Sequence, residues 1–227
     1  MRQQIPNIIT LLNLFLGCLA IVSCFQFGTV ASISESGEML IEIPEKLYLA
    51  SLFIGLAAVV DFFDGYVARL LNVPSEMGKQ LDSLADMVTS GVVPGLVMYK
   101  MLGDIQENQS QYNLTEDTYY MGVVPYLGFL ITLASCYRLA KFNVDTRQTD
   151  SFIGLPTPAN ALLIMSIPMI QFHSEFEWLV DFLSNPYVLV GVTVLSSYLL
   201  NAEIPLFSLK VKSFSWEKYK MQVVFLI

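Results

Sequence analysis

Four aspartates stand at helical spacing in two adjacent apolar stretches of the chain. Asp61 and Asp64 are three residues apart, and Asp82 and Asp86 are four residues apart after a short turn. On α-helices each pair occupies one face. Because the connection is so short, the two helices must be antiparallel neighbours. The sequence therefore predicts that both acidic faces meet at the same end of a helical hairpin.

Crowded carboxylates in an apolar setting require a cation or protonation, because like charges repel and burial disfavours the charged form. A set of oxygen ligands favours the hard ions Mg²⁺, Mn²⁺ or Ca²⁺ over zinc. A pair of such ions is typical of displacement reactions at phosphorus. Gly65, Ala68 and Gly78 stand beside the acids, where their small size leaves room for a flat or bulky ligand to approach the backbone.

Some of these residues would also suit a structural role or a transport role. Small residues mark close contacts between helices in membranes, and aspartates can form solvated helix ends. Carboxylates within a membrane can instead line a cation-transport pathway. The shared register of four aspartates favours metal-assisted chemistry over both alternatives.

The elements that position the acids are expected to be transmembrane helices. Hydrophobic residues make up 54% of the 227-residue chain and charged residues only 14%, and the mean hydropathy is +0.56. Several stretches approach the roughly 20 apolar residues that cross a bilayer. We predict an all-α bundle of six transmembrane helices in a single membrane-embedded domain over residues 1–227, with spans at about 6–28, 47–72, 79–102, 121–142, 155–173 and 186–204. Residues 205–227 would form a cytoplasmic tail or begin a further hydrophobic segment.

The charges alternate along the chain, although the net charge is -8. Acidic residues gather in the connections after the first, third and fifth predicted spans: Glu35, Glu38, Glu42, Glu45, Asp104, Glu107, Glu116, Asp117, Glu175, Glu177 and Asp181. Basic residues gather at the opposite ends: Arg2, Arg69, Lys79, Arg138, Lys141, Arg147, Lys210, Lys212, Lys218 and Lys220. The excess of cations on the cytoplasmic side of membrane proteins therefore predicts a cytoplasmic amino terminus and acidic site.

The acidic hairpin resembles the CDP-alcohol phosphotransferase family, whose members are integral membrane enzymes with a six-helix core. All eight signature positions match, as Asp61-x-x-Asp64-Gly65-x-x-Ala68-Arg69 and, after eight residues, Gly78-x-x-x-Asp82-x-x-x-Asp86. The resemblance implies that Asp61, Asp64 and Asp82 bind two divalent ions, Mg²⁺ or Mn²⁺, and that Asp86 lies at the metal site and acts as the general base. It also implies that a CDP-linked lipid contacts Gly65, Ala68, Arg69 and Gly78, with Arg69 near the phosphates.

Three further segments bear on the acceptor alcohol. Asn7, Thr10 and Asn13 share one side of the first predicted helix, the stretch 137–144 ends the fourth span with Arg138, Lys141 and Asn143, and the stretch 152–161 turns into the fifth span. Taken singly, such residues are typical of helix starts, hydroxyl bonds within a helix or interfacial anchors. Together, in this order, they resemble the CDP-diacylglycerol–serine phosphatidyltransferases of that family.

This second resemblance implies serine as the acceptor, and glycerol 3-phosphate and inositol phosphate are the alternatives. The six polar side chains named above would then contact the acceptor or a phosphate. The expected partners are CDP-diacylglycerol, L-serine, the lipid bilayer and a second copy of the chain, and no nucleic acid is expected. The expected location is the cytoplasmic membrane of a prokaryote, with the active site facing the cytoplasm.

Overall fold

The computed structural model describes residues 4–25, 30–33, 39–42, 47–71, 75–111, 122–144 and 152–206. Most of these residues are helical. The helices are α1 (Gln4–Phe25), α2 (Leu47–Leu70), α3 (Glu76–Asp86), the π-helix η1 (Met87–Val92), α4 (Val93–Gln111), the 3-10 helix η2 (Val124–Gly128), α5 (Phe129–Val144), α6 (Thr157–His173), α7 (Glu177–Leu183) and α8 (Pro186–Asn201). The strands form two short antiparallel pairs. Strand β1 (Val30–Ile33) pairs with β2 (Met39–Glu42), and β3 (Phe152–Ile153) pairs with β4 (Pro205–Leu206).

Helices occupy all six stretches in which the sequence predicts a span. Within the described residues, three segments are long and apolar enough to cross a membrane: Gln4–Phe25, Leu47–Leu70 and Glu76–Gly103. The pair α7 and α8, which bends by 64°, would make a fourth if it counts as one span. Helices α5, α6 and α8 have 16 or 17 residues each. The short strands and α7 are additions to the expected all-α bundle, and residues 207–227 of the expected tail lie outside the described residues.

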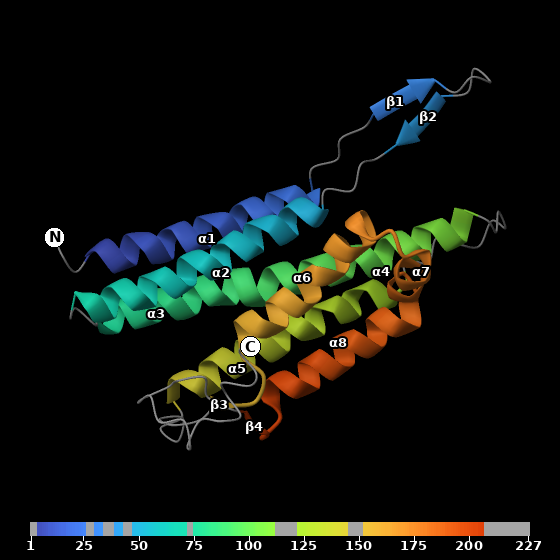
Figure 1. The fold of residues 1–227 in the computed structure, drawn as a ribbon. Helices are drawn as coiled ribbons and strands as arrows, with labels where there is room; N and C mark the ends of the chain where they lie inside the picture. Colours follow the sequence, from blue (N-terminus) through green and yellow to red (C-terminus); the bar gives the residue numbers. More distant parts are fainter. Residues whose placement is uncertain are drawn as a thin grey trace.

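Figure 1 shows α1, α2 and the continuous segment α3–η1–α4 lying lengthwise beside one another. Helix α1 begins at the end of the bundle where α2 turns into α3, and β3 pairs with β4 toward this same end. The β1–β2 hairpin projects from the opposite end, on which α7 also lies. The connection between α2 and α3 therefore makes them antiparallel, as the sequence predicts.

Helix α1 has its polar and small side chains inside and its large apolar side chains outside. The buried positions include Asn7, Thr10 and Asn13, followed by Gly17 and Ala20. The exposed positions are apolar: Ile8, Leu11, Leu12, Phe15 and Val22. A helix whose outer surface is apolar and whose inner surface is small and polar suits a lipid environment, because lipid tails solvate the outer side chains.

The π-helix η1 begins immediately after Asp86 and widens the third apolar segment for six residues. Such bulges release backbone groups from the regular helical pattern. The carbonyl of Gly91 in η1 accepts a hydrogen bond of 3.0 Å from the Thr132 hydroxyl on α5. The interruption is therefore tied to a neighbouring helix directly behind the acidic hairpin.

Candidate active site

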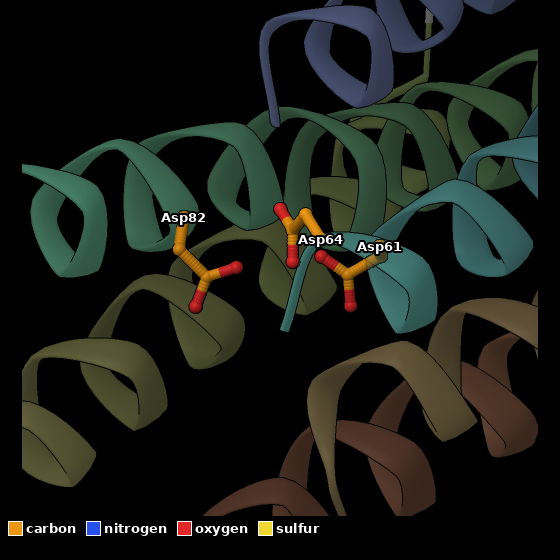
Figure 2. Close-up of side chains that lie close together, drawn as sticks. All are labelled: Asp61, Asp64 and Asp82. Carbon is orange, nitrogen blue, oxygen red and sulfur yellow. The ribbon is translucent and has the colours of Figure 1, made fainter. Parts of the chain in front are cut away.

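Three of the four aspartates come together between α2 and α3. Carboxylate oxygens of Asp61, Asp64 and Asp82 all lie within 4.8 Å of one another. Figure 2 shows Asp61 and Asp64 on α2 and Asp82 on α3, with their carboxylates close together. Asp64 is buried, and the other two are half-buried. The hairpin thus brings Asp82 to the first acidic pair, Asp61 and Asp64, which is part of what the helical spacing predicts.

The start of α3 is set by a local cap. The Ser75 hydroxyl accepts a hydrogen bond of 3.0 Å from the backbone amide of Gly78, which satisfies one of the amides left unpaired at a helix start. A Cβ atom at Gly78 would lie 3.0 Å from that hydroxyl and 3.3 Å from the side-chain oxygen of Asn7. The glycine therefore lets α1 and the cap approach α3 closely.

Asp86 lies outside the group of three. It is the last residue of α3, one turn and about 6 Å along the helix axis from Asp82. With Asp61 and Asn13 it lines a second, smaller recess, which η1 and α6 complete. Asp61 borders both spaces, so it is the member of the three-aspartate cluster that the two spaces share.

A cavity of about 350 Å³ lies over the three-aspartate cluster. Its lining combines the acids with small residues and polar groups of α1 and α3: Pro6, Asn7, Thr10, Asp61, Asp64, Gly65, Ala68, Ser75, Gly78, Lys79 and Asp82. Gly65, Ala68 and Gly78 are thus at the cavity as predicted. Arg69 is exposed in the last turn of α2 and does not belong to this lining.

Lys79 carries the only positive charge among the described residues that line the cavity. The sequence pattern placed it among the cytoplasmic cations and in no site. Its position in the sequence, between Gly78 and Asp82, could have indicated that Lys79 belongs to the site. The first turn of α3, which contains Lys79, borders the cavity.

Two of the predicted polar residues of α1 hold the acids directly. The Thr10 hydroxyl donates to Asp64 at 2.6 Å, and the Asn13 amide donates to Asp61 at 3.1 Å. Thr10 also lies 3.1 Å from the carbonyl of Pro6 in its own helix. The prediction placed these side chains at the acceptor or a phosphate, whereas the structure gives them carboxylate partners.

The three predicted polar residues of α5 line neither acidic space. Arg138 is buried, and its Nε donates to the carbonyl of Leu155 at 3.2 Å. Lys141 pairs with Glu203 at 3.3 Å. The Asn143 amide donates to the Ser83 hydroxyl at 3.0 Å, which joins α5 to the helix that carries Asp82. In this structure all three therefore connect helices or loops around the site.

The donor set of the cluster fits a hard divalent cation. Three carboxylates supply only oxygen ligands, which Mg²⁺ and Mn²⁺ prefer, and their oxygens are close enough for one ion to reach all three residues. Among the described residues, none of the three acids has an ion-pair partner. An ion that binds here would neutralise a phosphate group in the adjoining cavity.

Comparisons with known proteins agree with this geometry. Residues 3–200 match the family model described as CDP-alcohol phosphatidyltransferase. A protein of Bacillus subtilis named CDP-diacylglycerol–serine O-phosphatidyltransferase is 31% identical over 206 residues, which cover 89% of each chain. A Saccharomyces cerevisiae protein of the same name is 34% identical over 72% of this chain, and an archaetidylserine synthase of Methanothermobacter thermautotrophicus is 31% identical over 69% of it.

The extent of the matches differs between relatives. The matched part covers 53% of the yeast protein and 59% of the archaeal one, so the chain spans a little over half the length of these two. The family match itself includes α1, the acidic hairpin and all helices up to the last turn of α8. With its apolar helices and its eight signature residues, this membrane protein belongs to the CDP-alcohol phosphatidyltransferase family.

Proposed function

We propose that this protein transfers the phosphatidyl group of CDP-diacylglycerol to the hydroxyl of L-serine, which yields phosphatidylserine and CMP. The observation that carries the proposal is the cluster of Asp61, Asp64 and Asp82 beneath a cavity lined by Gly65, Ala68 and Gly78. Carboxylates beside glycine and alanine, whose small size leaves room for a ligand, suit a metal-bound pyrophosphate and a nucleotide. The names of the relatives supply serine as the acceptor.

Different aspartates would bind the metal ions and accept the proton in this reaction. Asp61, Asp64 and Asp82 would hold two ions, Mg²⁺ or Mn²⁺, which neutralise charge on the pyrophosphate and on the departing CMP. Asp86 takes the proton of the serine hydroxyl. The serine oxygen then bonds to the phosphorus that bears diacylglycerol, and the bond from this phosphorus to the CMP oxygen breaks. The lipid tails of the donor remain in the bilayer while its nucleotide occupies the cavity.

The charge of the cavity favours serine over a phosphorylated acceptor. Three carboxylates and a single cation, Lys79, line the described cavity. Arg138 and Lys141, which could have formed a denser cationic pocket for glycerol 3-phosphate or inositol phosphate, are directed to Leu155 and Glu203. A zwitterionic amino acid brings an ammonium group as well as a carboxylate, so it meets less repulsion from the acids.

The proposal includes the arrangement in the membrane. We infer six spans, one for each of α1, α2, α3–η1–α4, α5, α6 and α8, in a single catalytic domain that also forms a homodimer. The start of α1, the turn between α2 and α3, and the β3–β4 pair share one end of the bundle. Together with the cations near that end of the chain's helices, this favours a cytoplasmic active site in a prokaryotic membrane.

An assay with parallel acceptors tests the function. Purified protein in detergent or vesicles receives CDP-diacylglycerol, Mg²⁺ or Mn²⁺, and either serine, glycerol 3-phosphate or inositol phosphate, and the lipid product is identified by mass. We expect a lipid product, phosphatidylserine, only in the reaction that contains serine as the acceptor. Turnover only with a phosphorylated acceptor would remove the serine assignment and leave the family membership in place.

A further inference from the structure

Two side chains of α1 bond to two carboxylates of α2 in a regular pattern. Thr10 donates to Oδ2 of Asp64, and Asn13 donates to Oδ1 of Asp61. Because α1 and α2 are antiparallel, three residues forward along α1 correspond to three residues back along α2. The two bonds therefore repeat one pairing between the helices on successive turns.

Both hydrogen bonds are shielded from water by burial. The exposed fraction is 4% for Thr10, 1% for Asn13 and 6% for Asp64, so water competes little with these contacts. The Thr10 hydroxyl has one proton and two acceptors within reach. The carboxylate is the closer of the two, and a charged acceptor forms the stronger bond. The proton therefore points toward Asp64.

The orientation of Asn13 leads to the same conclusion. Its Nδ2 donates to Asp61 at 3.1 Å, while its buried Oδ1 accepts no hydrogen bond in the described part of the protein. Within that part, the carboxylate of Asp61 is thus the group that fixes the direction of this amide. An amide that is placed at some cost to its own oxygen indicates that its contact with the acid matters.

We propose that Thr10 and Asn13 are positioning residues of the metal site. Each holds one oxygen of its aspartate by a hydrogen bond, which would leave the other oxygen for a divalent ion. The proposal rests on the proposed function, because it requires a divalent ion at the cluster. It also identifies α1 as the third element of the site, beside the two helices that carry the acids.

A different role would be direct contact with substrate, since Thr10 also lines the cavity. Metal binding in the absence of substrate separates the two roles. Partners that orient metal ligands typically change metal affinity about 10–100-fold when they are removed. A residue that touches only the substrate leaves the affinity of the empty protein for metal unchanged.

The test measures Mn²⁺ binding to the full-length, substrate-free protein by electron paramagnetic resonance. Thr10→Val removes the hydroxyl at nearly constant shape, and Thr10→Ser keeps it. Thr193→Val is the matched control, because Thr193 is also buried in a helix and, in the described structure, its hydroxyl donates to the carbonyl of Leu189 at 2.8 Å and to no acid. We expect Thr10→Val to weaken Mn²⁺ binding about 10–100-fold, and we expect Thr10→Ser and the control to bind as the wild type does.

Equal Mn²⁺ affinity of Thr10→Val and the wild type overturns the proposal, as does a wild type that binds no Mn²⁺. If Thr10→Val does not fold, Asn13→Leu undergoes the same measurement with the same expected weakening. Formation of phosphatidylserine by the wild type is followed in parallel. If the wild type makes phosphatidylserine but Thr10→Val binds Mn²⁺ as tightly as the wild type, only the positioning role is refuted. If the wild type makes no phosphatidylserine but Thr10→Val binds Mn²⁺ more weakly than the wild type, only the proposed function is refuted.

Discussion

Gly65 offers a substitution in which stability and activity should change in opposite directions. It lies in α2 directly after Asp64 and lines the cavity. A Cβ atom built at this position meets no atom within 4 Å. The fold therefore has room for alanine, and any need for glycine must come from what enters the cavity.

The magnitudes follow from these two facts. Alanine in place of glycine inside a helix should stabilise the protein by about 0.5–1 kcal/mol, because glycine loses more backbone entropy on folding. The same methyl group projects into space that the nucleotide is proposed to occupy. One additional methyl group in a fitted pocket costs roughly 1–3 kcal/mol of transition-state binding, or about 10–200-fold in kcat/KM.

The same helix provides a control. Gly55 also lies in α2, and a Cβ atom there likewise meets nothing within 4 Å, but Gly55 does not line the cavity. We expect Gly55→Ala to gain similar stability in thermal unfolding and to keep its kcat/KM for CDP-diacylglycerol. Gly65→Ala should lose kcat/KM through a higher KM for this donor. Wild-type kinetics in a folded Gly65→Ala protein would refute close approach of the donor to α2.

Three further predictions concern the base, the metal and the packing. Asp86→Asn should abolish turnover but retain CDP binding, and near-normal release of CMP would exclude Asp86 as the base. Removal of divalent ions with a chelator should stop the reaction, and added Mg²⁺ or Mn²⁺ should restore it; full activity of metal-depleted protein would contradict the role of the three-aspartate cluster. Gly128→Ala should destabilise the fold by about 1–3 kcal/mol. The new Cβ atom would lie 2.5 Å from the backbone nitrogen of Tyr99 and 2.8 Å from the carbonyl oxygen of Gly95. Unchanged thermal unfolding would refute this close contact of α4 with η2.

The acidic hairpin could be predicted because it depends on local geometry. Helical spacing sets which aspartates share a face, and a short connection forces the two helices together. The lining of the cavity by Gly65, Ala68 and Gly78 follows from the same register. Asp86 shares the face of Asp82 but lies one turn further along α3 and outside the cluster of three, which the spacing alone did not indicate.

Contacts between separate parts of the chain could not be read from spacing. Asn7, Thr10 and Asn13 indicate that one side of α1 is polar, but the depth and rotation of α1 against α2 decide that two of them meet aspartates. The bond from Asn143 to Ser83 depends in the same way on how α5 packs. The π-helix after Asp86 has no local sequence signal, since tertiary packing, including the bond from Thr132, supports it.

The most direct test of the central claim follows the serine oxygen. The protein receives CDP-diacylglycerol, a divalent ion and serine whose hydroxyl group carries heavy oxygen, and mass spectrometry locates the label. If this oxygen attacks the phosphorus that bears diacylglycerol, the phosphatidylserine carries the label, the CMP carries none, and the two products form in equal amounts. Label in CMP, or phosphatidylserine without label, would contradict the proposed displacement.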